Sequence, residues 1–154
     1  MSAVAAFSPR NPDYQERVRE SFQRQGAMHL IGARLTRVAP GECEIQLPFR
    51  DDLGQQHGFF HGGILSTIAD SAAGYAGFSL MPRDASVLTI EFKTNFLAPA
   101  AGELLIARGR VVKPGRTLTV AEAHTYAVDD GKETLVATLT GTLMVVTHVQ
   151  EPAG

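Results

Sequence analysis

The chain has 154 residues, the size of one domain and enough to bury a core without disulfide bonds. With 44% hydrophobic and 19% charged residues, the composition is that of a globular protein. A formal net charge of −2 gives no electrostatic reason to expect nucleic acid or an anionic membrane as a partner. The single cysteine, Cys43, excludes an internal disulfide and a cysteine metal cluster. We expect one domain over residues 1–154, with flexible tails at 1–11 and 148–154.

The first twenty residues lack a basic start followed by an apolar core, so no secretory signal is predicted and we expect a cytoplasmic protein. Residues 62–81 form a twenty-residue run with one charge, which is long enough to cross a bilayer. However, the run contains four glycines, three serines and a threonine. Its aspartate, Asp70, would cost about 2.5–3.5 kcal/mol in a span. We therefore expect a helix buried in a soluble domain.

The N-terminal third predicts one short helix and a hairpin. Residues 12–25 have apolar side chains at every fourth position, which indicates a helix with one apolar stripe, and Gly26 is expected to end it. Residues 30–38 predict a strand, 39–42 a turn, and 43–49 a second strand with alternating apolar residues. The polar residues that follow, 50–58, predict a loop that leads into the central helix.

After residue 85 the apolar residues alternate with polar ones, as in strands that bury one face. Pro-Gly and Asp-Gly turns separate the predicted strands, which cover 86–97, 103–112, 117–128 and 134–146. The predicted fold class is α+β: a curved antiparallel sheet of about six strands wrapped around one long central helix, plus a short N-terminal helix. This arrangement describes the hotdog fold.

Asp70 is the only Asp, Glu, Lys or Arg between Asp52 and Arg83. It falls in the middle of the predicted helix, where N-capping does not explain it. A buried carboxylate is costly, and active sites are where proteins retain such groups. Asp70 is therefore a candidate catalytic carboxylate, and a structural aspartate with a hydrogen-bonded partner is the alternative.

His61, Gly62 and Gly63 stand where the loop becomes the helix. The first backbone N–H groups of a helix have no intrahelical acceptor and carry the positive end of the dipole. Glycine lets a ligand oxygen approach them, so this segment suits an oxyanion hole. A tight turn that needs glycine only for its geometry is the alternative.

The spacing between these two candidates has a consequence for assembly. Asp70 lies nine residues after His61, or about 13 Å along a helix. One chain therefore cannot place its own carboxylate beside its own oxyanion donors. If the two act together, the active site is shared between two copies in a homodimer.

Residues 57–76, HGFFHGGILSTIADSAAGYA, resemble the signature of hotdog-fold acyl-CoA thioesterases of the phenylacetic acid degradation (PaaI-like) type. That signature reads Asn-x-x-Gly-x-x-His-Gly-Gly, with an Asp nine residues after the His. The resemblance continues through 89–100, 102–117 and 135–145. It thus covers most of the chain after residue 30.

The resemblance implies a role for each matching residue. Gly62 donates its N–H to the thioester carbonyl, and His61 orders the loop. Asp70 of the partner protomer acts as general base or nucleophile, and Thr89 helps to place the water or the carboxylate. The family's Asn is Gln55 here, which keeps the amide but adds a methylene group.

For substrate binding, a group of cations near the 113–116 turn is a candidate for the phosphates of coenzyme A, with a solvated strand end as the alternative. The Gly-Arg-Thr sequence in this turn resembles the family's Gly-Lys/Arg-Thr/Ser. Two aromatic residues before the oxyanion loop are candidates either for the acyl pocket or for the core. The predicted substrate- and CoA-binding residues are Gly63, Phe59, Phe60, Arg108, Arg110, Lys113, Gly115 and Arg116.

The predicted function is hydrolysis of an aromatic or medium-chain acyl-CoA to the free acid and CoA. The resemblance implies no cofactor beyond the CoA of the substrate, and a tetramer built as a dimer of dimers. His57 and His61 with Asp70 suggest a metal only faintly, because Gly58 and the loop context argue against a helical ligand pair. A non-catalytic acyl-CoA sensor and an acyl-thioester hydratase on the same fold are the alternatives.

Overall fold

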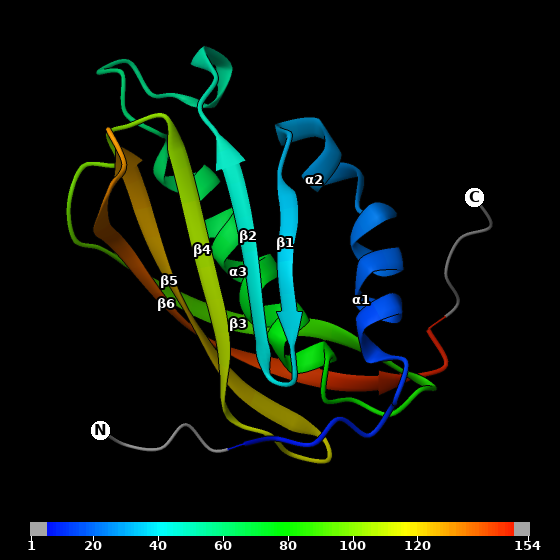
Figure 1. Ribbon diagram of the computed structural model, residues 1–154. Coiled ribbons are helices and arrows are strands. Elements are labelled where there is room, and N and C mark those ends of the chain that lie inside the picture. The colour runs from blue at the N-terminus through cyan, green and yellow to red at the C-terminus, as the bar shows by residue number, and fades with distance from the viewer. Residues whose placement is uncertain (1–5, 150–154) are drawn as a thin grey trace.

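The computed structural model describes residues 6–149. Within this range, six antiparallel strands form a curved sheet that wraps around one long helix (Figure 1). The elements are α1 (Tyr14–Gln23), α2 (Gly26–Ile31), β1 (Arg34–Ala39), β2 (Glu42–Pro48), a 3-10 turn η1 (Asp51–Leu53), α3 (Gly62–Phe78), β3 (Ala85–Phe96), β4 (Leu104–Lys113), β5 (Leu118–Asp129) and β6 (Lys132–Thr147). The predicted α+β hotdog architecture is confirmed.

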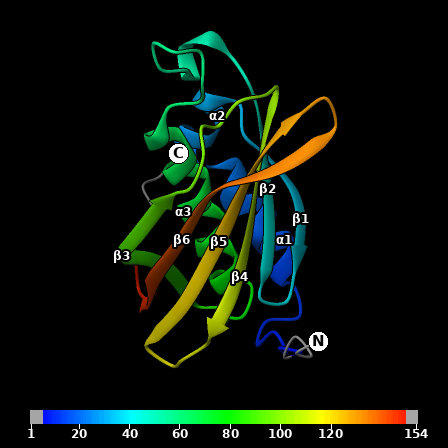
Figure 2. The same cartoon turned by 90° about the vertical axis from the view of Figure 1, so that its left-hand side faces the viewer.

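The order of strands in the sheet is β1-β2-β4-β5-β6-β3. β3 precedes β4 in the chain, yet it pairs with β6 at the opposite side of the sheet. The connection from β3 to β4 therefore crosses the sheet instead of closing a hairpin. Figure 2 shows β3 and β1 at opposite edges, with α3 between them. This crossing places β3 next to the middle of α3, where it contributes to the candidate site.

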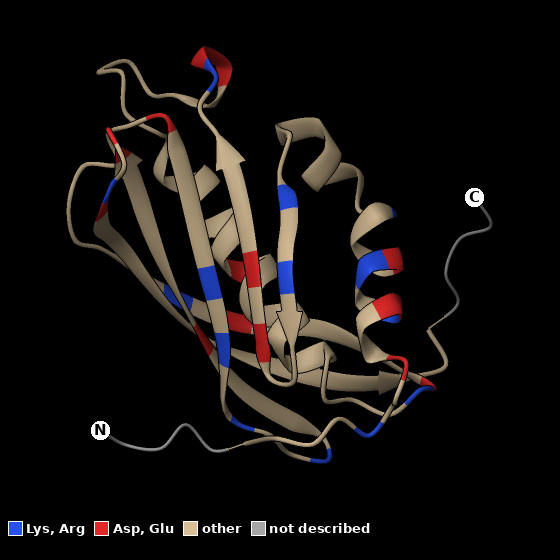
Figure 3. Ribbon diagram, viewed as in Figure 1, with Lys and Arg blue, Asp and Glu red and all other residues tan. Residues whose placement is uncertain are grey.

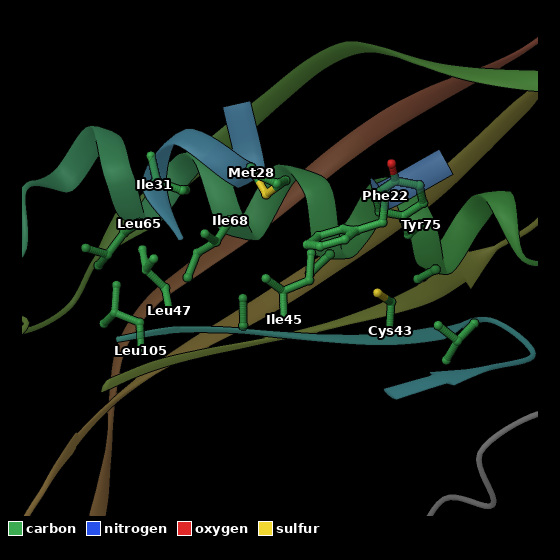
Figure 4. Packing of buried hydrophobic residues seen from close by; sticks show 14 of the residues in the cluster. Phe22, Met28, Ile31, Cys43, Ile45, Leu47, Leu65, Ile68, Tyr75 and Leu105 are labelled. Carbon is green, nitrogen blue, oxygen red and sulfur yellow. The ribbon is translucent and has the colours of Figure 1, made fainter. Parts of the chain in front are cut away.

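The core lies between α3 and the concave face of the sheet. Apolar side chains from β2 and β4, including Ile45, Leu47 and Leu105, face Leu65 and Ile68 of α3 (Figure 4). Alternation along the strands produces this face, since every second residue of β2 is buried. Burial of such side chains is the main favourable term in folding.

Small residues set how closely α3 approaches the sheet. A Cβ added to Gly109 of β4 would lie 2.2 Å from the Ala72 carbonyl oxygen. A Cβ on Gly77 would lie 2.4 Å from Cδ1 of Leu143. The small residues of α3 therefore serve close helix–sheet packing, as expected of a helix buried inside a domain.

The region after α1 differs from the sequence prediction. Gly26 begins a second short helix, α2, instead of only ending the first, and the strand predicted from residue 30 starts at Arg34. Gly32 ends α2 in the left-handed conformation at φ +79°. Met28 and Ile31 are buried while Leu30 is exposed, so the apolar residues here follow a helical period.

Part of the predicted N-terminal tail is packed against the domain. Phe7 packs against the core cluster, and Asn11 is only 2% exposed, with its Oδ1 accepting the Asp13 N–H at 3.1 Å. Residues 6–11 therefore lie on the domain. Of the two predicted tails, residues 148 and 149 follow β6, while 1–5 and 150–154 fall outside the described residues.

The central helix is slightly shorter than its apolar run. The run was predicted as helical over 62–81, and α3 ends at Phe78 with Ser79 as its C-cap. The Ser79 hydroxyl donates to the Ala76 carbonyl at 2.7 Å and accepts the Gly41 N–H at 2.8 Å, which anchors this end. Across residues 6–149, no helix combines the length and apolarity that crossing a membrane requires.

Candidate active site

The N-terminus of α3 leaves one backbone donor unused. His61 is the N-cap, and its Nδ1 accepts the Gly63 N–H at 2.9 Å. The N–H groups of Ile64 and Leu65 both donate to the His61 carbonyl. Among the described residues, none accepts the N–H of Gly62. This group stands at the positive end of the helix dipole and is available to a ligand oxygen.

The cap also defines the tautomer of the neutral His61 ring. Because Nδ1 of His61 accepts a hydrogen bond, the proton of the neutral ring is on Nε2. The Gly63 N–H is occupied by this cap, so Gly63, predicted to bind substrate, has no free backbone donor. A Cβ on Gly63 would lie 3.1 Å from the His61 Nδ1. His61 thus caps α3, and its predicted role in ordering the loop during catalysis stays a prediction.

Phe96 forms a wall beside the unused donor. A Cβ on Gly62 would lie 3.1 Å from the Phe96 ring, which is 56% exposed at the end of β3. Sequence reasoning missed Phe96, because it stands in an ordinary strand pattern 34 residues after Gly62. Only the position of β3 at the edge of the sheet brings the ring to the start of α3.

Asp70 lies in the middle of α3 and is held from the neighbouring strand. The Thr89 hydroxyl on β3 donates to Asp70 Oδ1 at 2.8 Å. Burial raises the pKa of the Asp70 carboxyl above its usual value, and the hydrogen bond from Thr89 opposes that rise. The contact joins two residues that sequence analysis placed in the same site. A carboxylate with one oxygen fixed and a raised pKa is suited to accept a proton.

A concavity of about 130 Å³ opens beside this carboxylate. α1 and the residues after it form one wall, and α3 with β3 form the others. None of the α1 residues here was predicted, because they precede the recognised motif and α1 was interpreted only as a packing helix. The lining residues are Ser21, Gln25, Asp70, Ser71, Gly74, Tyr75, Val87 and Thr89.

The two candidate catalytic groups are far apart within one chain. Gly62 and Asp70 both lie on α3, eight residues apart, which is about 12 Å along the axis. The rigid helix fixes this separation. One chain thus carries a candidate oxyanion donor and a candidate catalytic carboxylate that do not meet.

Gln55, Phe59 and Phe60 precede α3 and lie in three different environments. Gln55 Oε1 accepts the His57 N–H, so the amide nitrogen is the free end of this side chain. Phe59 is half-buried. Phe60 belongs to the core, edge-on to Phe49 with 4.9 Å between ring centroids. Of the two alternatives for Phe60, the structure supports a core residue.

The predicted CoA-binding cations do not gather in one place. Arg108 donates two hydrogen bonds of 2.7 Å to Glu133 and one of 3.1 Å to Glu44. Arg110 pairs with Glu122 at 2.5 Å. Figure 3 shows these basic positions of β4 beside the acidic positions of β2. Both arginines are already paired with carboxylates.

The remaining predicted residues lie in the turn between β4 and β5. Lys113 and Arg116 are exposed there. A Cβ on Gly115 would lie 2.1 Å from the Leu118 carbonyl oxygen, so the turn requires glycine for its close approach. Within residues 6–149, no cluster of three or more His, Cys, Asp or Glu side chains is placed to hold a metal ion. Burial raises the pKa of the Cys43 thiol to about 12, consistent with a core residue.

Comparison with known families identifies the family of the chain. The model of the thioesterase superfamily matches residues 57–134, which include His61, Asp70 and Thr89. The chain belongs to the thioesterase superfamily. It is therefore a hydrolase, and the matched segment contains the loop, the helix and the strand described above.

This thioesterase has similar solved and curated relatives. A thioesterase family protein from Silicibacter pomeroyi is 55% identical, with a TM-score of 0.86 over 87% of this chain and 98% of that one. The 1,4-dihydroxy-2-naphthoyl-CoA hydrolase of Listeria monocytogenes is 27% identical over 97 residues, 63% of this chain and 79% of that protein. The E. coli PaaI protein from the phenylacetic acid degradation operon is 20% identical, with a TM-score of 0.77 over 87% of this chain and 94% of that one. At that identity the likeness to PaaI concerns the fold alone, so a PaaI-like specificity stays a prediction for this thioesterase.

Proposed function

We propose that this thioesterase hydrolyses an acyl-CoA to the free acid and CoA. The observation that carries the proposal is the Gly62 N–H, which has no acceptor among the described residues at the start of α3. A thioester carbonyl oxygen at this position gains the hydrogen bond and the helix dipole as it becomes negative. The name of the Listeria relative, a CoA thioester hydrolase, supports an acyl-CoA as the substrate.

In the proposed mechanism, Asp70 removes a proton from a water molecule whose oxygen attacks the thioester carbon. The carbonyl electrons move to the oxygen, which the Gly62 N–H stabilises. When the carbonyl re-forms, the carbon–sulfur bond breaks and the CoA thiolate takes a proton from Asp70. In the alternative route, the Asp70 carboxylate attacks the thioester carbon, the carbon–sulfur bond breaks and the CoA thiolate leaves. Water then hydrolyses the resulting mixed anhydride to the free acid and regenerates the Asp70 carboxylate. Because a thioester is already activated, a carboxylate and an oxyanion donor are sufficient, and we propose that no cofactor takes part.

The site requires a second copy of the chain. β3 is an edge strand that leaves apolar side chains half-exposed, including Leu88, Ile90 and Phe92. An exposed apolar edge tends to pair with another strand, and a second β3 would satisfy it. We propose a homodimer in which Asp70 of one protomer faces Gly62 of its partner. In this arrangement the donor and the carboxylate come from different chains. Their separation of about 12 Å within one chain (about two helical turns) therefore does not keep them apart.

The proposal also covers the contact between two dimers and the residues that bind the CoA phosphates. A second apolar set on the outer face of the sheet (Val112, Leu118, Val120 and Met144) is exposed and suits the contact between two dimers in a tetramer. For the CoA phosphates, Lys113 and Arg116 are better candidates than the two arginines already paired with glutamates. The role of Phe59 in the acyl pocket and the role of Gln55 in catalysis also stay predictions, as does a cytoplasmic location.

A panel of acyl-CoAs tests the proposed function. The purified wild-type enzyme is incubated with short-chain, medium-chain and aromatic acyl-CoAs, and free CoA is measured with a thiol-reactive dye. We expect thiol release from at least one class. Binding of acyl-CoA without thiol release would favour the sensor alternative. Hydration of an enoyl-CoA, seen as loss of its absorbance, would favour a hydratase, although His61 Nδ1 is already engaged with Gly63.

The pH dependence of hydrolysis should report the state of Asp70. Activity requires the ionised carboxylate, so kcat/KM is expected to fall on the acid side at a pH above the usual Asp range. Thr89→Val removes the hydrogen bond that lowers the pKa of Asp70, so the acid limb should move to higher pH. Thr89→Ser keeps the hydroxyl and should leave the limb in place. An unchanged acid limb in Thr89→Val would show that Asp70 does not control it.

A further inference from the structure

The concavity beside Asp70 adjoins the proposed catalytic carboxylate, so a substrate group close to the reacting carbonyl can enter it. It is bounded by α1, α3 and β3, and the Asp70 and Thr89 side chains form part of its wall. Its volume is about 130 Å³. A cavity of about 150 Å³ in a protein core holds one benzene molecule. The space therefore accommodates a compact group of about one ring.

Gln25 gives the concavity a polar end. Its backbone is fixed on both sides: the N–H donates to the Phe22 carbonyl at 3.0 Å, and the carbonyl accepts from Met28 at 3.1 Å. Gln25 Oε1 accepts the Ser71 hydroxyl at 3.4 Å, which leaves the amide nitrogen as the free end. Over the described part of the chain, no group accepts from this nitrogen. The amide is therefore a donor lining the space beside Asp70.

The other polar groups in the wall are already paired. The Ser21 hydroxyl and the Tyr75 hydroxyl lie 3.2 Å apart in a mutual hydrogen bond. One of these two hydroxyls donates to the other, whereas no described residue accepts from the Gln25 amide nitrogen. An acyl group with an acceptor atom at its far end would satisfy that donor, whereas a purely apolar group would leave it unpaired at a cost.

Gly74 keeps the concavity open. It lies in the interior of α3, where glycine is less favourable than alanine. A Cβ at this position would meet nothing within 4 Å, so neither the backbone nor a neighbour requires glycine. Gly74 is one of the residues that line the concavity, so a methyl group at this position would occupy space at its wall.

We infer that Gln25 and Gly74 determine which acyl group the enzyme accepts: a compact one of about ring size, with a hydrogen-bond acceptor at its far end. Gly74 sets the size limit, and the Gln25 amide nitrogen binds the acceptor. The inference rests on the proposed acyl-CoA hydrolysis. It narrows the predicted acyl group from any aromatic or medium-chain group to a compact one of about ring size.

The test compares the ratio of kcat/KM for two substrates in each variant with the same ratio in the wild type, so that the intrinsic reactivity of each thioester cancels. The probes are acetyl-CoA, benzoyl-CoA and isonicotinoyl-CoA, the last being the same size as benzoyl with an acceptor nitrogen at the far end. Gly74→Ala should lower kcat/KM for both ring substrates by about 10-fold relative to acetyl-CoA. Its melting temperature should not fall, because alanine favours the helix.

Gln25→Met removes the amide at nearly constant volume. It should lower kcat/KM for isonicotinoyl-CoA relative to benzoyl-CoA by about 10-fold, since an unpaired polar group is left in the pocket. Gly26→Ala is the matched control for the glycine variant. Gly26 is also helical, its added Cβ also meets nothing within 4 Å, and it does not line the concavity. Its substrate ratios should equal those of the wild type.

The two proposals fail in different ways. If the wild-type enzyme releases CoA from these or any other acyl-CoAs and both variants keep the wild-type ratios, the inference is wrong and the proposed function stands. If the wild type hydrolyses no acyl-CoA at all, the proposed function fails and the inference fails with it. If Gly26→Ala changes the ratios as Gly74→Ala does, the effect comes from the helices in general and the assignment to Gly74 is overturned.

Discussion

Gly62→Pro is expected to lower kcat for thioester hydrolysis by about 10²–10³-fold, the range found when one oxyanion-hole donor is removed. Proline has no N–H, so the substitution deletes the proposed donor itself. Gly62 is the first residue of α3, a position that proline tolerates well. His61 before it has φ −66° and ψ 136°, the conformation that a residue preceding proline prefers. The helix should therefore persist while the donor is lost.

Gly62→Ala is the control for the added bulk. Alanine keeps the N–H but places a Cβ against the Phe96 ring, whose exposed end has room to shift. We expect the alanine variant to retain most of the activity, and circular dichroism to show the same helix content in both variants. Equal kcat values for the proline and alanine variants would exclude the Gly62 N–H as the oxyanion donor.

Asp70→Asn is expected to reduce kcat by at least about 10²-fold, because the amide neither accepts the proton of water nor attacks the thioester. Asparagine has nearly the same shape and can still accept the hydrogen bond from Thr89. The loss should therefore appear in kcat, measured as CoA release at saturating substrate. Hydrolysis at the wild-type rate would remove Asp70 from the mechanism.

The same variant should be more stable than the wild type at neutral pH. The pKa of Asp70 is raised in the folded state, so ionisation above that pKa costs folding free energy. Asparagine avoids the cost. The gain in melting temperature should shrink as the pH falls through the folded-state pKa and Asp70 becomes protonated in the wild type. A catalytic carboxylate that reduces stability is a common trade-off in enzymes.

The two inactive variants together test whether the active site is shared. In a mixed dimer, the Asp70→Asn chain supplies an intact Gly62 and the Gly62→Pro chain supplies an intact Asp70, so one of the two sites is complete. Random exchange of protomers in a two-fold symmetric dimer should restore about a quarter of the wild-type activity. If differently tagged chains are shown to have exchanged and no activity returns, the shared site is wrong.

Local patterns in the sequence were sufficient to predict most of the fold. Alternating apolar residues predicted the strands within a few positions, since one buried sheet face imposes a period of two. The small residues after Gly63 predicted a helix buried against the sheet, and Gly77 and Gly109 show why large residues are excluded. The His-Gly-Gly start and the isolated Asp70 marked the candidate site, because helix ends and buried carboxylates have fixed chemical consequences.

The tertiary structure decided which residues meet. The position of β3 at the sheet edge brought Phe96 to Gly62, and no local pattern specifies the order of strands. Packing of α1 brought Gln25 to the concavity beside Asp70, across 45 positions of sequence. Arg108 pairs with carboxylates on β2 and β6, two partners that no local pattern around Arg108 specifies. The sequence by itself determined the elements and their chemistry through local periodicity, while the partners of each side chain depend on long-range packing that only the folded chain defines.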